Sequence, residues 1–332
     1  MAITIRDVAK KAGVAPSTVS RVVADSSSIS DKTKDKVRKV MRELNYFPNA
    51  NAQGLASSHS KTFGLVLPLA TDAFYQNPFF PTVLRGINFS MAKNDYTILL
   101  SSGQTDEQRL NHIQKIVYGK QVEGLIFLYA AKDDPLLLFA QETDCPSVVL
   151  GSPKNSKVHL VDNNNEMLGE LATNHLIENG CENIAYIGGD MNQFFISDRM
   201  KGYINALEKH GLPCKKENIY NDLVFLPLDG YHLAQKNLDL EKLDGLVIAD
   251  ELVAEGIQKA LIGKDITHIQ IVNFKAFEQK LDLPTPQESY INLNSHLIGS
   301  RAVDILFDSL KDSRKLNEQY IHEYVDAELI HE

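Results

Sequence analysis

The sequence contains few cysteines and no long hydrophobic run. Its 332 residues include only Cys145, Cys181 and Cys214, an odd number with more than thirty residues between neighbours. This spacing favours free thiols in a reducing compartment over a disulfide framework or a zinc cage. No stretch approaches the roughly 18 apolar residues of a membrane-spanning helix, and the N-terminus lacks the apolar core of a secretory signal. We therefore expect a cytoplasmic protein without a membrane partner.

Motifs of the common enzyme classes are also missing. The chain has no Gly-x-Ser-x-Gly elbow, no His-Glu-x-x-His, no Walker loop and no Gly-x-Gly-x-x-Gly fingerprint. Its ten histidines show no metal-ligand spacing, and Gly188-Gly189, without a lysine, is a weak anion-binding signal. The sequence disfavours an enzyme, and we expect no catalytic residue, cofactor or metal.

The net charge of −9 hides an uneven distribution. Residues 1–60 contain ten Lys and Arg against five Asp and Glu, whereas residues 61–332 contain 24 against 38. A basic segment joined to an acidic remainder is typical of a nucleic-acid-binding head on a body with another task. A solvated charged face would give the same excess, so charge alone leaves both interpretations open.

The basic segment has the start and stop signals of three short helices. Thr4 can cap a first helix with Asp7 as its capping-box acid, and Gly13 can end that helix in the left-handed conformation. Pro16 suits the first turn of a second helix, so the two helices and their short turn predict a helix-turn-helix. A third helix follows Ser30. A generic three-helix bundle would share this pattern.

A more specific signal comes from three segments of residues 1–48: Thr4–Val14, Ser17–Val22 and Leu44–Asn49. Together they closely resemble the headpiece of LacI/GalR-type bacterial repressors. The resemblance implies that this headpiece binds double-stranded operator DNA with the second helix in the major groove. One departure is Ala15, where the family usually has a capping serine. The lysines and Arg38 of the third helix are expected to contact phosphates or to be solvated.

The resemblance also implies which residues contact DNA. In the headpiece they are Thr4, Pro16, Ser17, Thr18 and Arg21, and in the following segment Asn49, Ala52 and Leu55. Arg21 can donate two hydrogen bonds to a guanine and would be the main specificity contact, because proline and serine discriminate little between bases.

Residues 49–62 are small and polar apart from Leu55. A flexible linker is the plain interpretation, because a helix of about seven residues is too short to be stable alone in water. In the family this segment becomes a hinge helix on the operator, and the matching leucine is inserted in the minor groove. Gly54 departs from the bulkier residue usual there and lowers the helicity further.

The body, residues 63–332, alternates short β-branched runs with helical periods. The predicted strands are Phe63–Leu67, Thr97–Leu100, Gly124–Leu128, Ser147–Leu150, Ile184–Ile187, Leu246–Ala249 and Ile269–Val272. Such alternation predicts an α/β fold with parallel sheets covered by helices. An internal repeat, Val122–Ile126 and Leu243–Val247, supports two similar lobes.

With the resemblance, this pattern implies a two-lobed body of the periplasmic-binding-protein kind (type I), joined to the small all-α headpiece. We place the N-lobe at about 63–160 plus 292–320 and the C-lobe at about 161–291 plus 321–332. The ligand is expected in the cleft where the carboxyl ends of the strands meet.

The family's effector-binding positions can be placed by similarity. Arg199 matches the arginine that grips two neighbouring oxygens of the effector, and Asp250 stands where the family often has an asparagine. Phe79 and Phe80 match aromatic effector contacts, although ordinary packing explains them almost as well. Aromatic residues expected on cleft-side loops, where they could stack on a sugar, are Tyr75, Phe194, Phe195 and Phe274.

Lys275 is the clearest departure from the family, whose usual residue there is an acid that contacts effector. An unpaired buried lysine would be costly, so we expect Lys275 to pair with Asp250 or Glu251 or to face solvent.

These observations lead to one functional hypothesis, a homodimeric transcriptional repressor that binds an operator and senses a small sugar. Within the family, the headpiece and the segment Asn77–Ile87 are most similar to maltose-operon repressors, which implies maltose or a malto-oligosaccharide as the effector. Two alternatives stay open: a global carbon-catabolite regulator that uses a phosphocarrier corepressor, and a sugar-binding receptor without a regulatory role.

Overall fold

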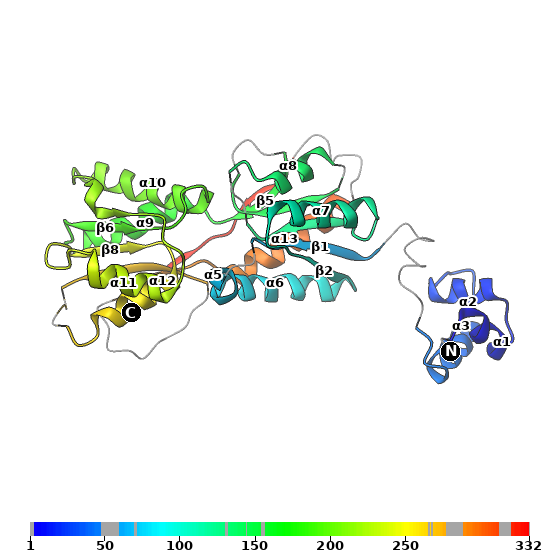
Figure 1. Cartoon of the computed structure of the whole chain (residues 1–332). Coiled ribbons are helices and arrows are strands. Elements are labelled where there is room, and N and C mark those ends of the chain that lie inside the picture. Colours follow the sequence, from blue (N-terminus) through cyan, green and yellow to red (C-terminus); the bar gives the residue numbers. More distant parts are fainter. Residues whose placement is uncertain are drawn as a thin grey trace. The chain divides into compact units, whose positions relative to one another are not determined.

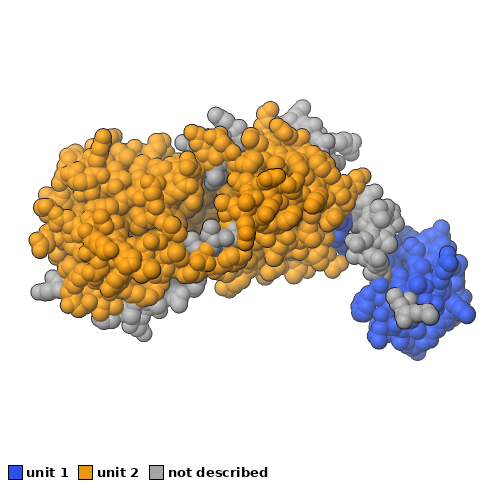
Figure 2. All heavy atoms as spheres, in the orientation of Figure 1, with its two compact units in different colours: residues 1–61 blue, residues 62–332 orange. Residues whose placement is uncertain are grey.

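The protein forms two compact units, residues 1–61 and residues 62–332 (Figure 2). The computed structural model describes residues 3–47, 60–69, 72–129, 132–143, 145–153, 157–264, 266, 268–276, 288–311 and 320–331. All three cysteines are free thiols. No helix in these described ranges is long and apolar enough to cross a membrane.

The described residues of the first unit form three helices: α1 (Ile5–Ala12), α2 (Pro16–Val23) and α3 (Asp31–Glu43). Each helix is amphipathic and buries one apolar stripe. The shared core consists of Val8, Ala9, Ala12, Val19, Val22, Val37 and Val40. The predicted helix-turn-helix headpiece is confirmed.

The second unit contains two six-stranded sheets (Figure 1). The first has the order β11-β5-β4-β3-β1-β2, and all its pairs are parallel. Its strands are β1 (Thr62–Val66), β2 (Thr97–Ser101), β3 (Gly124–Phe127), β4 (Ser147–Leu150), β5 (His159–Asp162) and β11 (His322–Tyr324).

The second sheet has the order β12-β10-β9-β8-β6-β7. Its strands are β6 (Ile184–Ile187), β7 (Ile219–Tyr220), β8 (Gly245–Ile248), β9 (Gln270–Lys275), β10 (Glu288–Asn292) and β12 (Glu328–His331). Its pairs are parallel except that β12 runs antiparallel to β10. The predicted two-lobed α/β body is confirmed, with one antiparallel edge strand that the sequence did not indicate.

Helices cover both faces of the first sheet. On one face lie α6 (Phe79–Lys93), which follows the short α5 (Asp72–Gln76), and α13 (Ser295–Lys311); on the other lie α7 (Asp106–Tyr118) and α8 (Pro135–Glu142). Alternation along β1 explains this arrangement, because successive side chains of a strand point to opposite faces. Phe63 and Leu65 join the core under α6 and α13, whereas Val66 joins the core under α7 and α8.

The second lobe repeats this plan. Its helices are α9 (Asn165–Glu178) and α10 (Phe194–Lys209) on one face, and α11 (Pro227–Lys236) and α12 (Glu251–Leu261) on the other, with a short 3₁₀ turn, η1 (Lys216–Asn218), before β7. The pair α9 and α10 packs very closely. A Cβ atom at Gly169 of α9 would lie 2.1 Å from the backbone oxygen of Arg199 in α10. Glycine at this position therefore allows α9 to approach the backbone of α10 closely at Arg199.

The chain passes between the lobes at three places, and Asn163 joins them. Its side-chain amide donates to the backbone oxygens of Leu293 (3.2 Å) and Val325 (2.9 Å), which lie in the other two crossings. The sequence analysis placed all of residues 321–332 in the C-lobe, and this is wrong for β11, which pairs with β5 in the first sheet. The C-terminal residues 320–331 supply β11 to the first sheet and β12 to the second. These strands pair backbone groups at one edge of each sheet.

Candidate DNA-binding surface and effector cavity

The helices of the headpiece start in two different ways. Thr4 forms a complete capping box: its Oγ1 accepts from the Asp7 backbone N (3.4 Å), and its backbone N donates to the Asp7 carboxylate (2.9 Å). Gly13 ends α1 with a φ of 63°. In contrast, α2 begins at Pro16 after Ala15, which offers no side-chain hydrogen bond to the helix. The N-terminus of the expected recognition helix therefore lacks a side-chain cap.

The side chains expected to read DNA lie on the surface of α2. Pro16, Ser17 and Arg21 are exposed and Thr18 is half-buried, whereas Val19 and Val22 of the same helix are in the core. Arg21 makes no ion pair within the described residues and can reach an external partner.

The other expected DNA contacts differ in their setting. Thr4 is exposed, but its hydroxyl is already hydrogen-bonded to Asp7 (2.7 Å). The remaining three expected contacts, Asn49, Ala52 and Leu55, lie outside the described residues, as does Gly54.

One expectation for α3 is wrong. Lys34 is buried rather than solvated, and its Nζ lies 3.0 Å from Oδ1 of Asp25. Arg38 is exposed and binds the same carboxylate at 2.6 Å. Asp25 lies in the turn after α2 and has a φ of 50°. Because Lys34 and Arg38 belong to α3, their ion pairs with Asp25 hold this turn against α3. Together they hold the pKa of Asp25 below its usual value, chiefly through Lys34.

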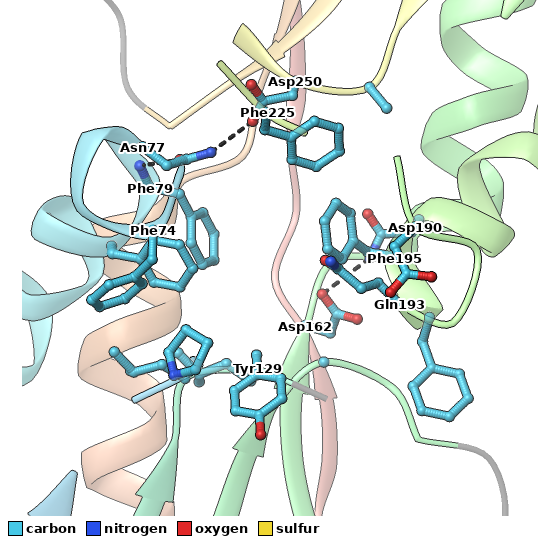
Figure 3. Close-up of a pocket in the computed structure, with 18 of the residues that line it drawn as sticks. Phe74, Asn77, Phe79, Tyr129, Asp162, Asp190, Gln193, Phe195, Phe225 and Asp250 are labelled. Carbon is cyan, nitrogen blue, oxygen red and sulfur yellow. Dashed lines mark hydrogen bonds between the residues drawn. The ribbon is translucent and has the colours of Figure 1, made fainter. Parts of the chain in front are cut away.

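The body contains a cavity of about 470 Å³ between its two lobes. Residues at or just after the carboxyl ends of β1, β3, β4, β5, β6, β8, β9 and β10 line it, as the parallel topology requires. Figure 3 shows side chains from both lobes pointing into the space. Five of the predicted effector residues meet around this cavity: Phe79, Phe80, Arg199, Asp250 and Phe274. Their contact with an effector stays a prediction.

Arg199 is 5% exposed and fixed by its neighbours. Its Nε donates to Oδ1 of Asn165 (2.9 Å), and its Nη1 donates to the backbone oxygen of Ala249 (2.6 Å). The guanidinium also lies 3.9 Å from the ring centre of Phe274. Burial lowers the pKa of Arg199 to about 10, so it stays charged at neutral pH.

Asp250 joins the two lobes across the cavity. Its Oδ1 caps α12 by accepting from the backbone N of Leu252 (2.9 Å), and its Oδ2 accepts from Nδ2 of Asn77 in the other lobe (2.6 Å; Figure 3). Asn77 in turn accepts from the backbone N of Phe79 (2.9 Å). Burial raises the pKa of Asp250 to about 6 despite these two donors and a third, the backbone N of Val253 (3.4 Å).

Two of the other carboxyl groups that line the cavity have raised pKa values, and neither was predicted as part of the site. Asp162 accepts from Ser152 Oγ (2.9 Å) and from Asn165 Nδ2 (3.1 Å), and burial raises its pKa to about 6. Glu251 accepts from the backbone N of Ala276 (3.3 Å), and burial and then the charge of Asp250 raise its pKa to about 8. Asp162 is the last residue of β5, and Glu251 follows Asp250 after the predicted strand Leu246–Ala249, which was the signal that could have identified Glu251.

Phenylalanine rings cover much of the remaining wall. Phe194 and Phe195 line the cavity as expected, although they lie at the start of α10 rather than in a loop, and Phe274 lies within β9. Tyr75 is wrongly placed by the sequence: it is 65% exposed, outside the lining, and its ring packs on Phe74 (5.0 Å between centres). Other lining residues that the sequence did not indicate include Phe74, Asn77, Tyr129 and Phe225.

Arg109 is a second buried arginine at the cavity wall that the sequence did not single out. It is 2% exposed, and it donates to the Asp106 carboxylate (2.8 Å), to the backbone oxygen of Leu67 (2.8 Å) and to the Tyr129 hydroxyl. Arg109 therefore has protein partners for both terminal nitrogens, whereas Arg199 uses Nε and Nη1.

The expectation for Lys275 is also wrong. Lys275 is buried, and its Nζ lies 3.4 Å from Oε1 of Glu288 on the neighbouring strand and 4.3 Å from the ring centre of Tyr290. Asn273 donates to the same Glu288 oxygen (2.7 Å). A buried ammonium group needs a buried counter-charge, and Glu288 supplies it in place of Asp250 or Glu251.

Comparisons with known proteins agree with both parts of the chain. The family of "Bacterial regulatory proteins, lacI family" matches residues 4–49, and "Periplasmic binding proteins and sugar binding domain of LacI family" matches residues 60–314. The HTH-type transcriptional regulator MalR of Streptococcus pneumoniae is 41% identical over 331 residues, 99% of each chain. Catabolite control protein A of Staphylococcus xylosus is 29% identical over 97% of this chain and 95% of its own.

A solved structure shows the same fold. The lac repressor dimer bound to operator and the anti-inducer ONPF superposes with a TM-score of 0.83 at 22% identity, over 99% of this chain and 98% of that chain. Both family models and the full-length relative match this chain, so it belongs to the LacI family of bacterial regulatory proteins and is a DNA-binding transcriptional regulator.

Proposed function

We propose that this regulator is a homodimeric repressor of a carbohydrate operon whose effector is maltose or a malto-oligosaccharide. The observation that carries the proposal is the cavity itself. It places amide, carboxylate and guanidinium groups among phenylalanine rings, at the carboxyl ends of two parallel sheets. Planar polar groups pair with neighbouring hydroxyls, and aromatic faces pack on the C–H surface of a sugar ring.

The size of the cavity and the resemblance to maltose-operon repressors support a short oligosaccharide. A volume of about 470 Å³ is within the range of small-ligand sites, and the wall is mostly apolar with a few fixed polar groups. The Asn77–Asp250 hydrogen bond crosses the cleft, so a sugar bound there contacts groups from both lobes.

The proposed mechanism is a linkage between cavity and operator. Ligand binding changes how the lobes meet, the paired hinges of the dimer respond, and the headpieces gain or lose their hold on DNA. Two headpieces bind two half-sites, which adds their free energies. If maltose changes operator affinity by some factor, the operator must change maltose affinity by the same factor. The sign of this factor decides between induction and corepression.

Two measurements test the proposal. Calorimetry of the full chain against maltose, trehalose, sucrose and purines should give heat with maltose, and heat with purines alone would contradict the sugar assignment. Gel-shift titration with an inverted-repeat operator should show tight binding that weakens steeply with salt and changes with maltose. Deletion of residues 1–60 should abolish DNA binding and spare maltose binding.

A second function, a global carbon-catabolite regulator, is favoured by the similarity to catabolite control protein A. It requires a phosphocarrier protein as a corepressor that raises operator affinity. Adding that protein to the gel shift, with and without maltose, separates the two functions, since the maltose repressor needs no second protein.

A further inference from the structure

The cavity's two arginines already bind protein groups through most of their donors. Arg199 uses Nε and Nη1 for Asn165 and Ala249, and one face of its guanidinium lies against Phe274. Arg109 uses both terminal nitrogens for protein oxygens. A phosphate binds arginine through two parallel N–H donors. Of the four terminal nitrogens, only Nη2 of Arg199 has no protein partner within the described residues, so a phosphate could bind two parallel donors there only by sharing Nη1 with the Ala249 carbonyl.

Carboxylates outnumber cations around the same space. The described lining residues include seven acids, namely Asp106, Asp133, Asp134, Asp162, Asp190, Asp250 and Glu251, against Arg109, Arg199 and Lys132. Lys132 is exposed at the rim. Asp106, Asp133 and Asp190 are exposed as well, so the less exposed part of the wall has four acids, Asp134, Asp162, Asp250 and Glu251, against Arg109 and Arg199.

Two of these acids are coupled to the same arginine. Asn165 accepts from Arg199 and donates to Asp162, so the amide bridges the cation and the first carboxylate. The second carboxylate, Asp250, directly follows the carbonyl of Ala249 that Arg199 binds. One positive charge therefore faces two negative ones, and the group as a whole is negative when both carboxyls are ionised.

Burial also opposes the ionisation of these two acids. Burial raises the pKa of Asp162 and of Asp250 to about 6, in spite of Arg199 and several hydrogen-bond donors. The cavity already disfavours the negative charge that it carries, so a phosphate ester, which has close to two negative charges at neutral pH, would be strongly disfavoured there.

We propose, on the basis of the proposed function, that the cavity binds the uncharged sugar and excludes its phosphate ester, with Asp162 and Asp250 as the specificity-determining residues. Repulsion of the wrong ligand is as effective a source of specificity as attraction of the right one. The effector is then a sugar that has not yet been phosphorylated, or one released from a larger glucan by hydrolysis.

The test compares each sugar with its own monophosphate by calorimetry on the full chain at near-neutral pH. The pairs are maltose with maltose 6′-phosphate and glucose with glucose 6-phosphate. We expect maltose to bind at least about 100-fold more tightly than its ester. An ester that binds as tightly as its parent sugar, or more tightly, would overturn the proposal.

Substitutions at Asp250 and Asp162 test whether these two carboxyl groups exclude the phosphate ester. Asp250→Asn and Asp162→Asn keep the shape of each side chain, and asparagine is also a good helix cap. Each should reduce the preference for maltose over its ester about tenfold, mainly by improving ester binding. Asp222→Asn is the matched control: it removes the same charge from an exposed residue with a φ of 65°, outside the cavity, and should leave the ratio unchanged.

The remaining outcomes separate this inference from the proposed function. A cooperative urea transition shows that a variant is folded, and an unchanged ratio in both folded variants would mean that shape, not charge, excludes the ester. If glucose binds and glucose 6-phosphate does not, while maltose gives no heat, the maltose assignment fails and the exclusion of phosphate esters stands.

Discussion

Arg21 of the headpiece and Arg199 of the cavity are held in opposite ways. Arg21 is exposed on α2 and makes no ion pair within the described residues, whereas Arg199 is 5% exposed and is bound by an amide, a carbonyl and an aromatic ring. A duplex brings phosphates and base edges that can order a mobile side chain, at a cost in side-chain entropy. A small sugar brings few such groups, so its site must be ordered before the sugar arrives.

The same contrast appears in the acids of the two units. In the headpiece, hydrogen bonds and ion pairs lower the pKa values of Asp7, Asp25 and Glu43. In the cavity, burial raises those of Asp162 and Asp250. These carboxylates of the headpiece lie at the surface, where hydrogen bonds and cations stabilise their charge. In the cavity the low dielectric makes the ionised form of a carboxyl group costly. Four experiments address this difference.

The largest expected effect comes from Arg199→Ala. Removing the guanidinium leaves two buried carboxylates without their cation, which should lower the free energy of unfolding of the body by about 3–5 kcal/mol. Urea unfolding followed through the tyrosines of the body measures this loss. Molecules that remain folded should bind operator normally but no longer respond to maltose.

Arg21→Ala is the comparison for that variant, because it should leave the urea midpoint unchanged. Equal midpoints for the two variants would remove the contrast between a free and a fixed arginine. A normal maltose response in Arg199→Ala would place the effector elsewhere.

The second experiment uses pH to separate the acids of the two units. Asp250 has a pKa of about 6 in the folded body against an ordinary 3.8, so the folded state binds more protons between these values. Its contribution to stability is therefore complete below about pH 4 and is lost as the pH rises through about 6, by roughly 3 kcal/mol. Asp250→Asn should remove this part of the slope.

The headpiece should behave in the opposite sense. The lowered pKa values of Asp7 and Asp25 mean that stability is present above their ordinary values and is lost as the pH falls. Hydrogen exchange, which reports separately on peptides from residues 3–47 and from the body, measures both slopes in one sample. Parallel slopes would contradict the assignment of paired and buried acids.

The third experiment tests the free arginine directly. Arg21→Ala should cost about 1–3 kcal/mol on the preferred operator and much less on sequences altered at the contacted base. Gel shifts on an operator library measure this relaxed preference. Arg42→Ala, at an exposed position on α3, is the control that should weaken all sequences equally. A uniform loss for Arg21→Ala would make Arg21 a phosphate contact as well.

The sequence predicted elements wherever a local signal was strong. Thr4, Gly13 and Pro16 located the ends of α1 and the start of α2, because caps act within one turn of a helix. The seven β-branched runs became strands. Five strands, β5, β7, β10, β11 and β12, were missed. Of these, β7 and β11 are sheet-edge strands of two or three residues, which carry too little pattern to detect.

Pairings between distant residues were beyond local reasoning. Arg199 and Asp250 could be placed by family resemblance, but the Asn77–Asp250 hydrogen bond joins residues 173 positions apart. Lys275 was assigned the wrong partner for the same reason, because Glu288 becomes its neighbour only when β9 pairs with β10. The exposure of Tyr75 depends on how α5 packs, and a single aromatic residue does not indicate this.

The smallest expected effect concerns the helix that presents Arg21. Ala15 has an extended backbone, with φ −72° and ψ 150°, and precedes Pro16 without a side-chain cap, whereas Thr4 caps α1 fully. Ala15→Ser should add a hydrogen bond to a free backbone N–H of α2 and stabilise the headpiece by about 0.5–1 kcal/mol, without changing the body. Hydrogen exchange of α2 amides measures the gain, and Ala24→Ser, at the other end of the helix, is the control. If Ala15→Ser slows exchange but leaves operator affinity unchanged, the missing cap does not limit DNA binding by α2. The order of α2 would then matter less for operator binding than the order of the cavity is expected to matter for effector binding.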